Sequence, residues 1–145
     1  MSEESTPIRA SCHCGAIAVI VPRVPEHINH CQCTICRRYG AAWGYYHPDE
    51  VKIETKPNAV TKQYIWGDRE ISFNFCDTCG CVLYWWPLQA PSTDGEEYKM
   101  GLNTSNVNPE VLRSVLQNAA IDKPTTSKDS TPEPVATQDL DRNFD

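Results

Sequence analysis

The chain has 145 residues, of which 13 are basic and 19 acidic, so its formal net charge is -6. This acidic balance disfavours a general nucleic-acid binder, because phosphate backbones are bound mainly through lysine and arginine. Residues 1–10 contain no apolar run typical of a secretory signal, and no later stretch approaches the roughly 20 apolar residues of a membrane-spanning helix. We therefore expect a cytoplasmic protein with no nucleic-acid or membrane partner.

Short apolar and aromatic segments predict a mainly β domain. In chain order, the expected strands are 16–21, 41–46, 60–66, 71–75, 82–86 and 98–102. These segments are rich in β-branched and aromatic residues, or alternate between apolar and polar residues at a period of two. One short helix is expected after Asn108, which can cap it, because Pro109 suits its first position and Val111, Leu112 and Val115 share a face.

The composition changes sharply at Asp122. From there to Asp145 the chain is rich in Lys, Pro, Thr, Ser and Asp, and Val135, Leu140 and Phe144 are its sizeable apolar residues. Such a segment cannot offset the entropy cost of ordering itself. We therefore predict a flexible N-terminus at 1–7, a single domain at 8–121 and a disordered polar tail at 122–145.

The cysteine content indicates bound metal. Eight cysteines is a high count for this length and implies either disulfides or metal ligands. In a reducing compartment, cysteines that lie two or three residues apart are better explained as ligands. Zinc prefers four ligands in a tetrahedron, so we expect two Zn²⁺ ions per chain. The expected ligands are Cys12, Cys14, Cys31, Cys33, Cys36, Cys76 and Cys79.

The segment 76–80 reads as a zinc knuckle. Its two thiolates at Cys76 and Cys79 lie on one side of a tight turn, and Gly80 can adopt the positive φ that such a turn tends to require. Cys12 and Cys14 can supply two more ligands, since alternate residues of an extended segment project to the same face. Four cysteines would make a closed, structural site that contributes directly to folding.

The cluster Cys31, Cys33 and Cys36 has no obvious fourth ligand. Three protein ligands and one position for an incoming group is the arrangement of catalytic zinc. Three thiolates leave a net charge near -1 on a zinc site, which disfavours water activation and favours a soft incoming thiol, whose pKa falls on coordination. Alternatively, one further side chain closes the site and makes it structural; the candidates are His13, His30, His47 and Cys81.

Spacing alone leaves the partition of the cysteines open. Cys76, Cys79 and Cys81 could instead form the three-ligand site, because Cys81 lies two residues from Cys79. We favour Cys81 as a buried thiol that binds no metal, since free cysteine packs as a small hydrophobe in a strand. Its role is not decided by the sequence.

With these motifs in place, the chain resembles the glutathione-dependent formaldehyde-activating enzyme family, which includes the centromere protein V proteins. The motifs that carry the resemblance are Ser-Cys-His-Cys-Gly at 11–15, His-Cys-Gln-Cys-Thr-Ile-Cys-Arg-Arg at 30–38 and Phe-Cys-Asp-Thr-Cys-Gly at 75–80, followed by Leu-Tyr-Trp at 83–85. The resemblance implies a mainly β, Mss4-like zinc-binding domain of small antiparallel sheets with at most one short helix.

The resemblance also implies the roles of the cysteines. Positions matching Cys12, Cys14, Cys76 and Cys79 hold the structural zinc of the family, and those matching Cys31, Cys33 and Cys36 hold its catalytic zinc. Cys81 is a departure, because threonine is common at this position, and a thiol there could add a ligand or a redox response. The family's activity is the formation or cleavage of the carbon-sulfur bond in the glutathione adduct of formaldehyde.

Two functions from different classes follow. The first is a zinc-dependent carbon-sulfur lyase that acts on a small-molecule thiol or thiol adduct, such as that of glutathione, at the three-cysteine zinc. Arg37 or Arg38 is expected to orient a substrate carboxylate, and His47 is a candidate acid or base beside an aromatic wall. The alternative is a non-catalytic binding or scaffold module that two structural zinc ions stabilise.

Overall fold

The computed structural model describes residues 6–89, 97–116 and 120–121. The predicted disordered tail at 122–145 lies outside the described residues, as do residues 1–5 of the predicted flexible N-terminus. Within the described residues, no helix is long and apolar enough to cross a membrane.

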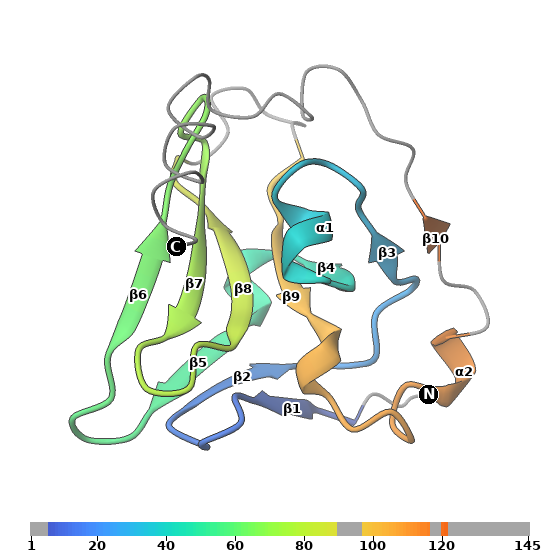
Figure 1. Cartoon of the computed structure of the whole chain (residues 1–145). Coiled ribbons are helices and arrows are strands. Elements are labelled where there is room, and N and C mark those ends of the chain that lie inside the picture. The colour runs from blue at the N-terminus through green and yellow to red at the C-terminus, as the bar shows by residue number, and fades with distance from the viewer. Residues whose placement is uncertain (1–5, 90–96, 117–119, 122–145) are drawn as a thin grey trace, which may run out of the picture.

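A three-stranded antiparallel sheet is formed by the N-terminal part of the domain. Its strands are β1 (Ile8–Ser11), β2 (Ile17–Val21) and β5 (Lys52–Thr55), in the order β1-β2-β5. In Figure 1 this sheet crosses the lower part of the molecule, below the strands of the larger sheet. All five residues of the central strand β2 are apolar, and four of them are buried, because the strand has a neighbour on each edge and the protein core covers it.

A seven-stranded sheet forms the rest of the domain, in the order β10-β3-β4-β9-β8-β7-β6. Its strands are β3 (Asn29–His30), β4 (Trp43–Tyr46), β6 (Thr61–Tyr64), β7 (Ile71–Cys76), β8 (Val82–Pro87), β9 (Met100–Asn103) and β10 (Ala120–Ile121). All neighbouring pairs are antiparallel except β10 and β3, which are parallel. The order places β9 between β4 and β8, although these strands are distant in sequence.

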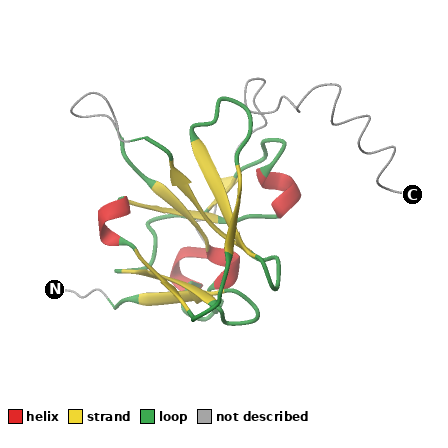
Figure 2. Ribbon diagram, turned by 90° about the vertical axis from the view of Figure 1, so that its left-hand side faces the viewer, coloured by secondary structure: helices red, strands yellow, loops and turns green. Residues whose placement is uncertain are grey.

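The helical segments are short. They are α1 (Cys36–Tyr39), α2 (Arg113–Leu116) and the 3-10 turns η1 (Pro48–Glu50) and η2 (Thr104–Asn106). Figure 2 shows them as single coils between the strands. The predicted mainly β fold class is confirmed. The expected helix corresponds to α2, which begins at Arg113 after a turn in which Asn108 Oδ1 accepts from Glu110 N at 2.9 Å, whereas α1 was not predicted.

The core lies between the two sheets. Fully buried apolar side chains from β2 pack in one cluster with those of β8 and β9, including Ile17, Val19, Leu83, Met100 and Leu102. Burial of such side chains stabilises the domain by roughly 1.5–3 kcal/mol each relative to exposure. The buried Cys12 and Cys76 belong to the same cluster, so one cysteine group lies at the seam of the two sheets.

A buried polar residue fixes the strands that carry the second cysteine group. Asn103, at the end of β9, accepts a hydrogen bond from the backbone N–H of Ala42 at 3.2 Å and donates to the carbonyl of Val82 at 2.9 Å. Thr104 Oγ1 donates to the carbonyl of Ala42 at 2.7 Å. These bonds hold the starts of β4 and β8 against β9, because buried polar groups need partners.

Candidate metal centres

Four cysteine sulfur atoms converge where the two sheets meet. Cys12 and Cys14 lie in the turn from β1 to β2, Cys76 ends β7 and Cys79 lies in the turn to β8. Their sulfur atoms all lie within 4.8 Å of one another. The separations are 3.8 Å between Cys12 and Cys14 and 3.6 Å between Cys14 and Cys76. A tetrahedral zinc with Zn–S bonds of about 2.3 Å requires about 3.8 Å between sulfurs, so this group fits the ion.

The backbone of this group has the knuckle geometry that the sequence predicted. The Thr78 N–H points at the sulfur of Cys76 at 3.3 Å, and the Gly80 N–H donates to the carbonyl of Cys76 at 2.8 Å. Gly80 has φ 79, a conformation that costs glycine little because it has no side chain. On the other hairpin, the Ile17 N–H points at the sulfur of Cys12 at 3.4 Å. These amides stabilise negative charge on the sulfurs.

One member of the group, Cys79, favours the thiolate before any metal arrives. At Cys14, by contrast, a hydrogen bond from the Ala16 backbone lowers the pKa of the thiol, but burial and hydrogen bonds with neighbouring thiols outweigh it and raise the pKa. Burial acts to raise the pKa of Cys79, but hydrogen bonds from the backbone N–H groups of Cys14 and Cys81 lower it to about 5. Cys79 is therefore in its ligand form at neutral pH, which assists metal capture.

Cys81 lies beside this group without belonging to it. A hydrogen bond from the His13 backbone lowers the pKa of its thiol, but burial and the neighbouring Cys79 outweigh it and raise the pKa. The four sulfurs that converge are those of Cys12, Cys14, Cys76 and Cys79. The alternative partition, with Cys76, Cys79 and Cys81 as a three-cysteine group, does not describe the geometry.

Three further cysteines converge in the loop between β3 and α1. The sulfur atoms of Cys31, Cys33 and Cys36 lie within 4.8 Å of one another, and all three residues are buried. The helix α1 begins at Cys36, whose N–H points at the sulfur of Cys33 at 3.4 Å. This spacing also fits a metal ion.

No fourth ligand joins these three cysteines within the part of the chain that the structure describes. The side chains that were considered for this role, at His13, His30, His47 and Cys81, all lie outside the group. A hydrogen bond with Cys31 and burial raise the pKa of the Cys36 thiol. A bound cation would offset the free-energy cost of ionising this buried thiol, because it stabilises thiolates directly.

A cavity of about 570 Å³ borders the three-cysteine group. Much of its wall is apolar or aromatic, from Ile35, Trp43, Trp66, Ile71, Phe73 and Trp85. Charged side chains also line it: Asp68 and Glu70 come from the connection between β6 and β7, and Lys99 precedes β9. Of the described residues, Lys99 is the one basic residue that lines this cavity. The volume and the mixed lining are typical of a small-molecule site.

The aromatic wall follows from the strand pattern. Trp43 and Tyr45 are alternate residues of β4 and therefore share a face, which is the face that the cavity borders. The ring of Trp85 lies over Gly101 of β9, where a Cβ atom would come within 2.1 Å of Trp85 Nε1. Gly101 thus provides the space that the Trp85 ring occupies. The sequence predicted an aromatic wall beside His47, but not the contribution of Trp85 from β8.

Arg37 and Arg38 of α1 are exposed and are not among the residues that line the cavity. The Arg37 guanidinium donates to the carbonyl of Gln32 at 3.0 Å, and that of Arg38 donates to the carbonyl of Thr34 at 2.7 Å. Both contacts brace the loop that carries the cysteines. The expectation that an arginine orients a substrate carboxylate therefore stays a prediction, and Lys99 is a better placed cation.

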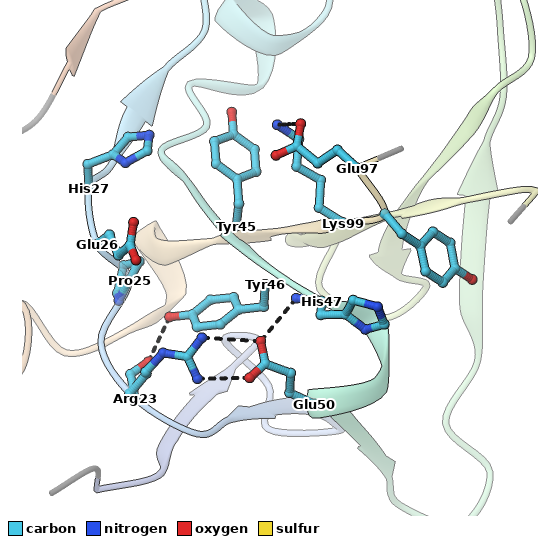
Figure 3. A pocket seen from close by; sticks show the side chains of 11 residues that line it. Arg23, Pro25, Glu26, His27, Tyr45, Tyr46, His47, Glu50, Glu97 and Lys99 are labelled. Atoms are coloured by element: carbon cyan, nitrogen blue, oxygen red, sulfur yellow. Dashed lines mark hydrogen bonds and ion pairs between the residues drawn. The ribbon is translucent and has the colours of Figure 1, made fainter. Parts of the chain in front are cut away.

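His47 lies in a different cavity, of about 320 Å³, shown in Figure 3. Its Nδ1 accepts the Asp49 N–H at 3.1 Å and so caps η1, and its ring meets Tyr98 edge-on with centroids 5.3 Å apart. In the same view, Arg23 forms an ion pair with Glu50 at 2.8 Å. Tyr45 and Lys99 line both cavities. The structure thus separates His47 from the three cysteines.

Comparison with known proteins assigns the chain to a family. The sequence profile described as "Glutathione-dependent formaldehyde-activating enzyme" matches residues 7–111, which is more than half of the chain. The chain belongs to this family. The glutathione-dependent formaldehyde-activating enzyme (GFA) match includes all seven cysteines of the two groups and all residues that line the cavity beside the three-cysteine group.

A solved structure supports the fold of this GFA-family chain. The crystal structure of a Rhodobacter sphaeroides protein, determined as a structural genomics target, aligns with a TM-score of 0.61 and 22% sequence identity. The alignment covers 79% of this chain and 100% of that protein. At this identity the likeness concerns the fold alone. No curated protein sequence matches the chain.

Proposed function

We propose that this GFA-family chain is a zinc-dependent carbon-sulfur lyase that makes or breaks the bond between a thiol and a small aldehyde. Zinc held by Cys31, Cys33 and Cys36 would supply a fourth coordination position that lowers the pKa of an incoming thiol. The observation that carries the proposal is that three buried thiols, with no fourth described ligand, border a cavity large enough for a small molecule.

The proposed reaction balances without a further reactant. In the forming direction, the thiol loses its proton, the thiolate sulfur attacks the carbonyl carbon of formaldehyde, a C–S bond forms as the C=O π bond breaks, and the oxygen takes up a proton, which gives a hydroxymethyl thioether with no net gain or loss of protons. In the reverse direction, the hydroxyl group loses its proton, the C–S bond breaks as the C=O bond forms, and the departing thiolate takes up a proton, so that thiol and aldehyde are released. The aromatic wall excludes water from the reacting sulfur and holds the adduct in one orientation.

The charges in the cavity favour a thiol that carries both an ammonium and a carboxylate. Asp68 and Glu70 can receive the positive group, and Lys99 can receive the negative one. The Lys99 ammonium lies 4.5 Å from the Tyr45 ring centroid and 3.4 Å from Glu97 Oε1, which orients it without burying it. Glutathione and cysteine have this combination of groups. We propose Lys99 for the carboxylate-binding role that the sequence suggested for Arg37 or Arg38, because Lys99 lines the cavity.

The proposal is tested by magnetisation-exchange NMR with ¹³C-formaldehyde and a thiol in equilibrium with their adduct. The zinc-loaded protein is expected to accelerate exchange between the free and adduct carbon signals in proportion to its concentration. Glutathione, cysteine and 2-mercaptoethanol should be compared, because the last lacks both charged groups. Exchange at the uncatalysed rate with all three thiols, in protein shown to contain two zinc ions, would reject the lyase.

The four-cysteine group has the separate function of holding the two sheets together. It joins the hairpin of β1 and β2 to that of β7 and β8. Its four sulfurs would fill all four positions of a tetrahedral zinc ion and leave none for a substrate. We propose that this group binds the second zinc ion of the chain and that this ion is structural. The non-catalytic scaffold alternative would require the three-cysteine group to be closed as well.

A further inference from the structure

The indole N–H of Trp43 is buried without a hydrogen-bond acceptor. Trp43 is 1% exposed, and its Nε1 is one of the buried polar atoms that lack a partner among the described residues. Native proteins satisfy most buried N–H groups, so each exception calls for a physical explanation. Tryptophan usually places its N–H against an acceptor when it is buried.

Trp43 packs in the same buried cluster as Cys36, and its Nε1 has no acceptor in hydrogen-bond geometry among the described residues. Hydrogen bonding with Cys31, together with burial, raises the pKa of the Cys36 thiol, whereas the neighbouring Trp43 side chain lowers it. A neutral thiol is only a weak acceptor, whereas a thiolate accepts strongly.

The surroundings of Trp43 offer few other acceptors. It packs in a buried cluster with the three cysteines, Ala41 and Phe73, and its ring centroid lies 6.1 Å from that of Phe73. Among the buried side chains of this cluster, the three cysteines are the ones that can accept a hydrogen bond, while the hydroxyl-bearing Tyr39 and Tyr45 pack against it from its partly buried edge. The unpartnered donor is therefore explained if one of these sulfurs is negatively charged in the functional state.

We infer that the Trp43 indole N–H donates a hydrogen bond to the Cys36 sulfur when that sulfur is a metal-bound thiolate. Trp43 is then a positioning residue, which acts on the metal through a ligand rather than on the substrate. The inference rests on the three-cysteine metal site of the proposed function, but not on the reaction proposed there. Groups that bond to metal ligands in this way orient the ligand and tune the metal.

The hydrogen bond has a definite chemical consequence. A donor at the sulfur withdraws electron density from one of the three thiolates, so the metal retains more positive charge. Three thiolates otherwise weaken zinc as a Lewis acid, and this bond restores part of its capacity to attract an incoming thiol. The bond also fixes Cys36 at the start of α1, beside the cavity.

The most direct test uses the unaltered protein loaded with ¹¹³Cd. A hydrogen bond from N–H to a metal-bound sulfur transmits scalar coupling between the indole proton and the metal nucleus. The Trp43 indole proton is expected to move downfield on metal loading and to couple to the cadmium of the three-sulfur site. The chain has four tryptophans, and the Trp43 resonance is identified by its absence from Trp43→Phe.

The outcomes of this experiment distinguish a failure of the Trp43 hydrogen bond from a failure of the three-cysteine metal site. A cadmium resonance from the three-sulfur site, with an unshifted and uncoupled Trp43 proton, would overturn the inference while leaving the metal site intact. No cadmium resonance from this site would overturn both the inference and the proposed function. A proton shift that appears only after a thiol is added would place the donor on the incoming ligand, which also overturns the inference.

A variant gives an independent measurement. Trp43→Phe removes the N–H but keeps an aromatic ring, and Trp85→Phe is the matched control because Trp85 lines the same cavity. In the cobalt(II) protein, Trp43→Phe should shift the sulfur-to-metal charge-transfer bands to lower energy, because the Cys36 thiolate becomes more electron-rich. Zinc affinity at this site should fall about tenfold or more. Equal spectra and affinities for the two variants would overturn the inference.

Discussion

The four-cysteine group lies in the turns of two hairpins, whereas the three-cysteine group lies in one loop against the face of the larger sheet. The first includes the exposed Cys14 and the partly buried Cys79, and the second consists of buried residues alone. The more exposed group is nevertheless the one with four ligands. The comparison teaches that ligand count and a bordering cavity, and not solvent exposure, distinguish the group that we propose to be open to substrate.

The contrast in connectivity is equally instructive. The four-cysteine group joins residues more than 60 positions apart, since Cys14 and Cys76 are 62 residues apart in the chain. The three-cysteine group spans only the six residues 31–36, so a metal bound there would link no distant segments of the chain. A metal that links distant segments contributes to folding, because the unfolded chain cannot hold it well. We therefore expect the two metals to differ in their effects on stability and on activity.

The largest expected effect is on stability, from Cys79→Ser. This change removes a ligand from the group that joins the sheets, so the domain should lose several kcal/mol of the roughly 5–15 kcal/mol that such domains possess. Thermal unfolding followed by circular dichroism, with zinc content measured in parallel, checks this. Cys81→Ser is the control, because its thiol lies beside the group without belonging to it. Equal stability of the two variants would contradict a structural role for the metal at the four-cysteine group.

The next effect is on activity, from Cys36→Ser. The change leaves two sulfurs in the three-cysteine group, so adduct exchange should fall at least about 100-fold. The unfolding midpoint should move much less than in Cys79→Ser, since this group joins no distant segments. Zinc content should drop from two ions to one. If Cys36→Ser and Cys79→Ser lost stability equally, the distinction between the groups would fail.

A smaller effect is expected from Lys99, which we propose to bind the carboxylate of the thiol substrate. Lys99→Met should raise the KM for glutathione about fivefold, because a partly exposed ion pair contributes at most about 1 kcal/mol. The KM for 2-mercaptoethanol should not change, since that thiol has no carboxylate. Lys52→Met, an exposed position on β5, is the control. An equal change in KM for both thiols would show that Lys99 does not select a carboxylate.

The smallest effect on turnover is expected from His47→Ala. The loss of the cap on η1 should cost about 1 kcal/mol of folding stability. Adduct exchange should stay within about twofold of the unaltered protein, because His47 lies in the neighbouring cavity. Chemical denaturation and exchange rates measured on the same sample check both statements. A loss of exchange as large as that of Cys36→Ser would contradict this, and would show that His47 takes part in the reaction at the three-cysteine group.

Much of the fold could be predicted because the longer strands have strong local patterns. The expected segments 16–21, 71–75 and 82–86 correspond to β2, β7 and β8, where apolar runs or alternation are clear. The strands β1, β3, β5 and β10 were missed. β3 has only two residues, and β5 has polar residues at its ends because it lies at a sheet edge. Helix α1 is a single turn, too short for a periodic signal.

The candidate site could be predicted only in part, for a physical reason. Cysteine spacing identifies ligands, because a short loop must bring its own thiols together. Lys99 and Trp85 enter the cavity through strand pairing, since β9 lies between β4 and β8. Such neighbours are distant in sequence and leave no local signal. His47 illustrates the converse, because proximity in sequence to the cysteines did not bring it into their cavity.

The most direct test of the central claim is a thiol titration of the protein in which cobalt(II) replaces zinc. The visible d-d bands and the sulfur-to-metal charge-transfer bands report the ligand set at each metal. We predict that glutathione changes the spectrum of one site of the two in a saturable way, and that Cys36→Ser loses this change. Two sites that both show four sulfurs before any thiol is added, and no change on titration, would contradict the account and indicate a closed metal scaffold.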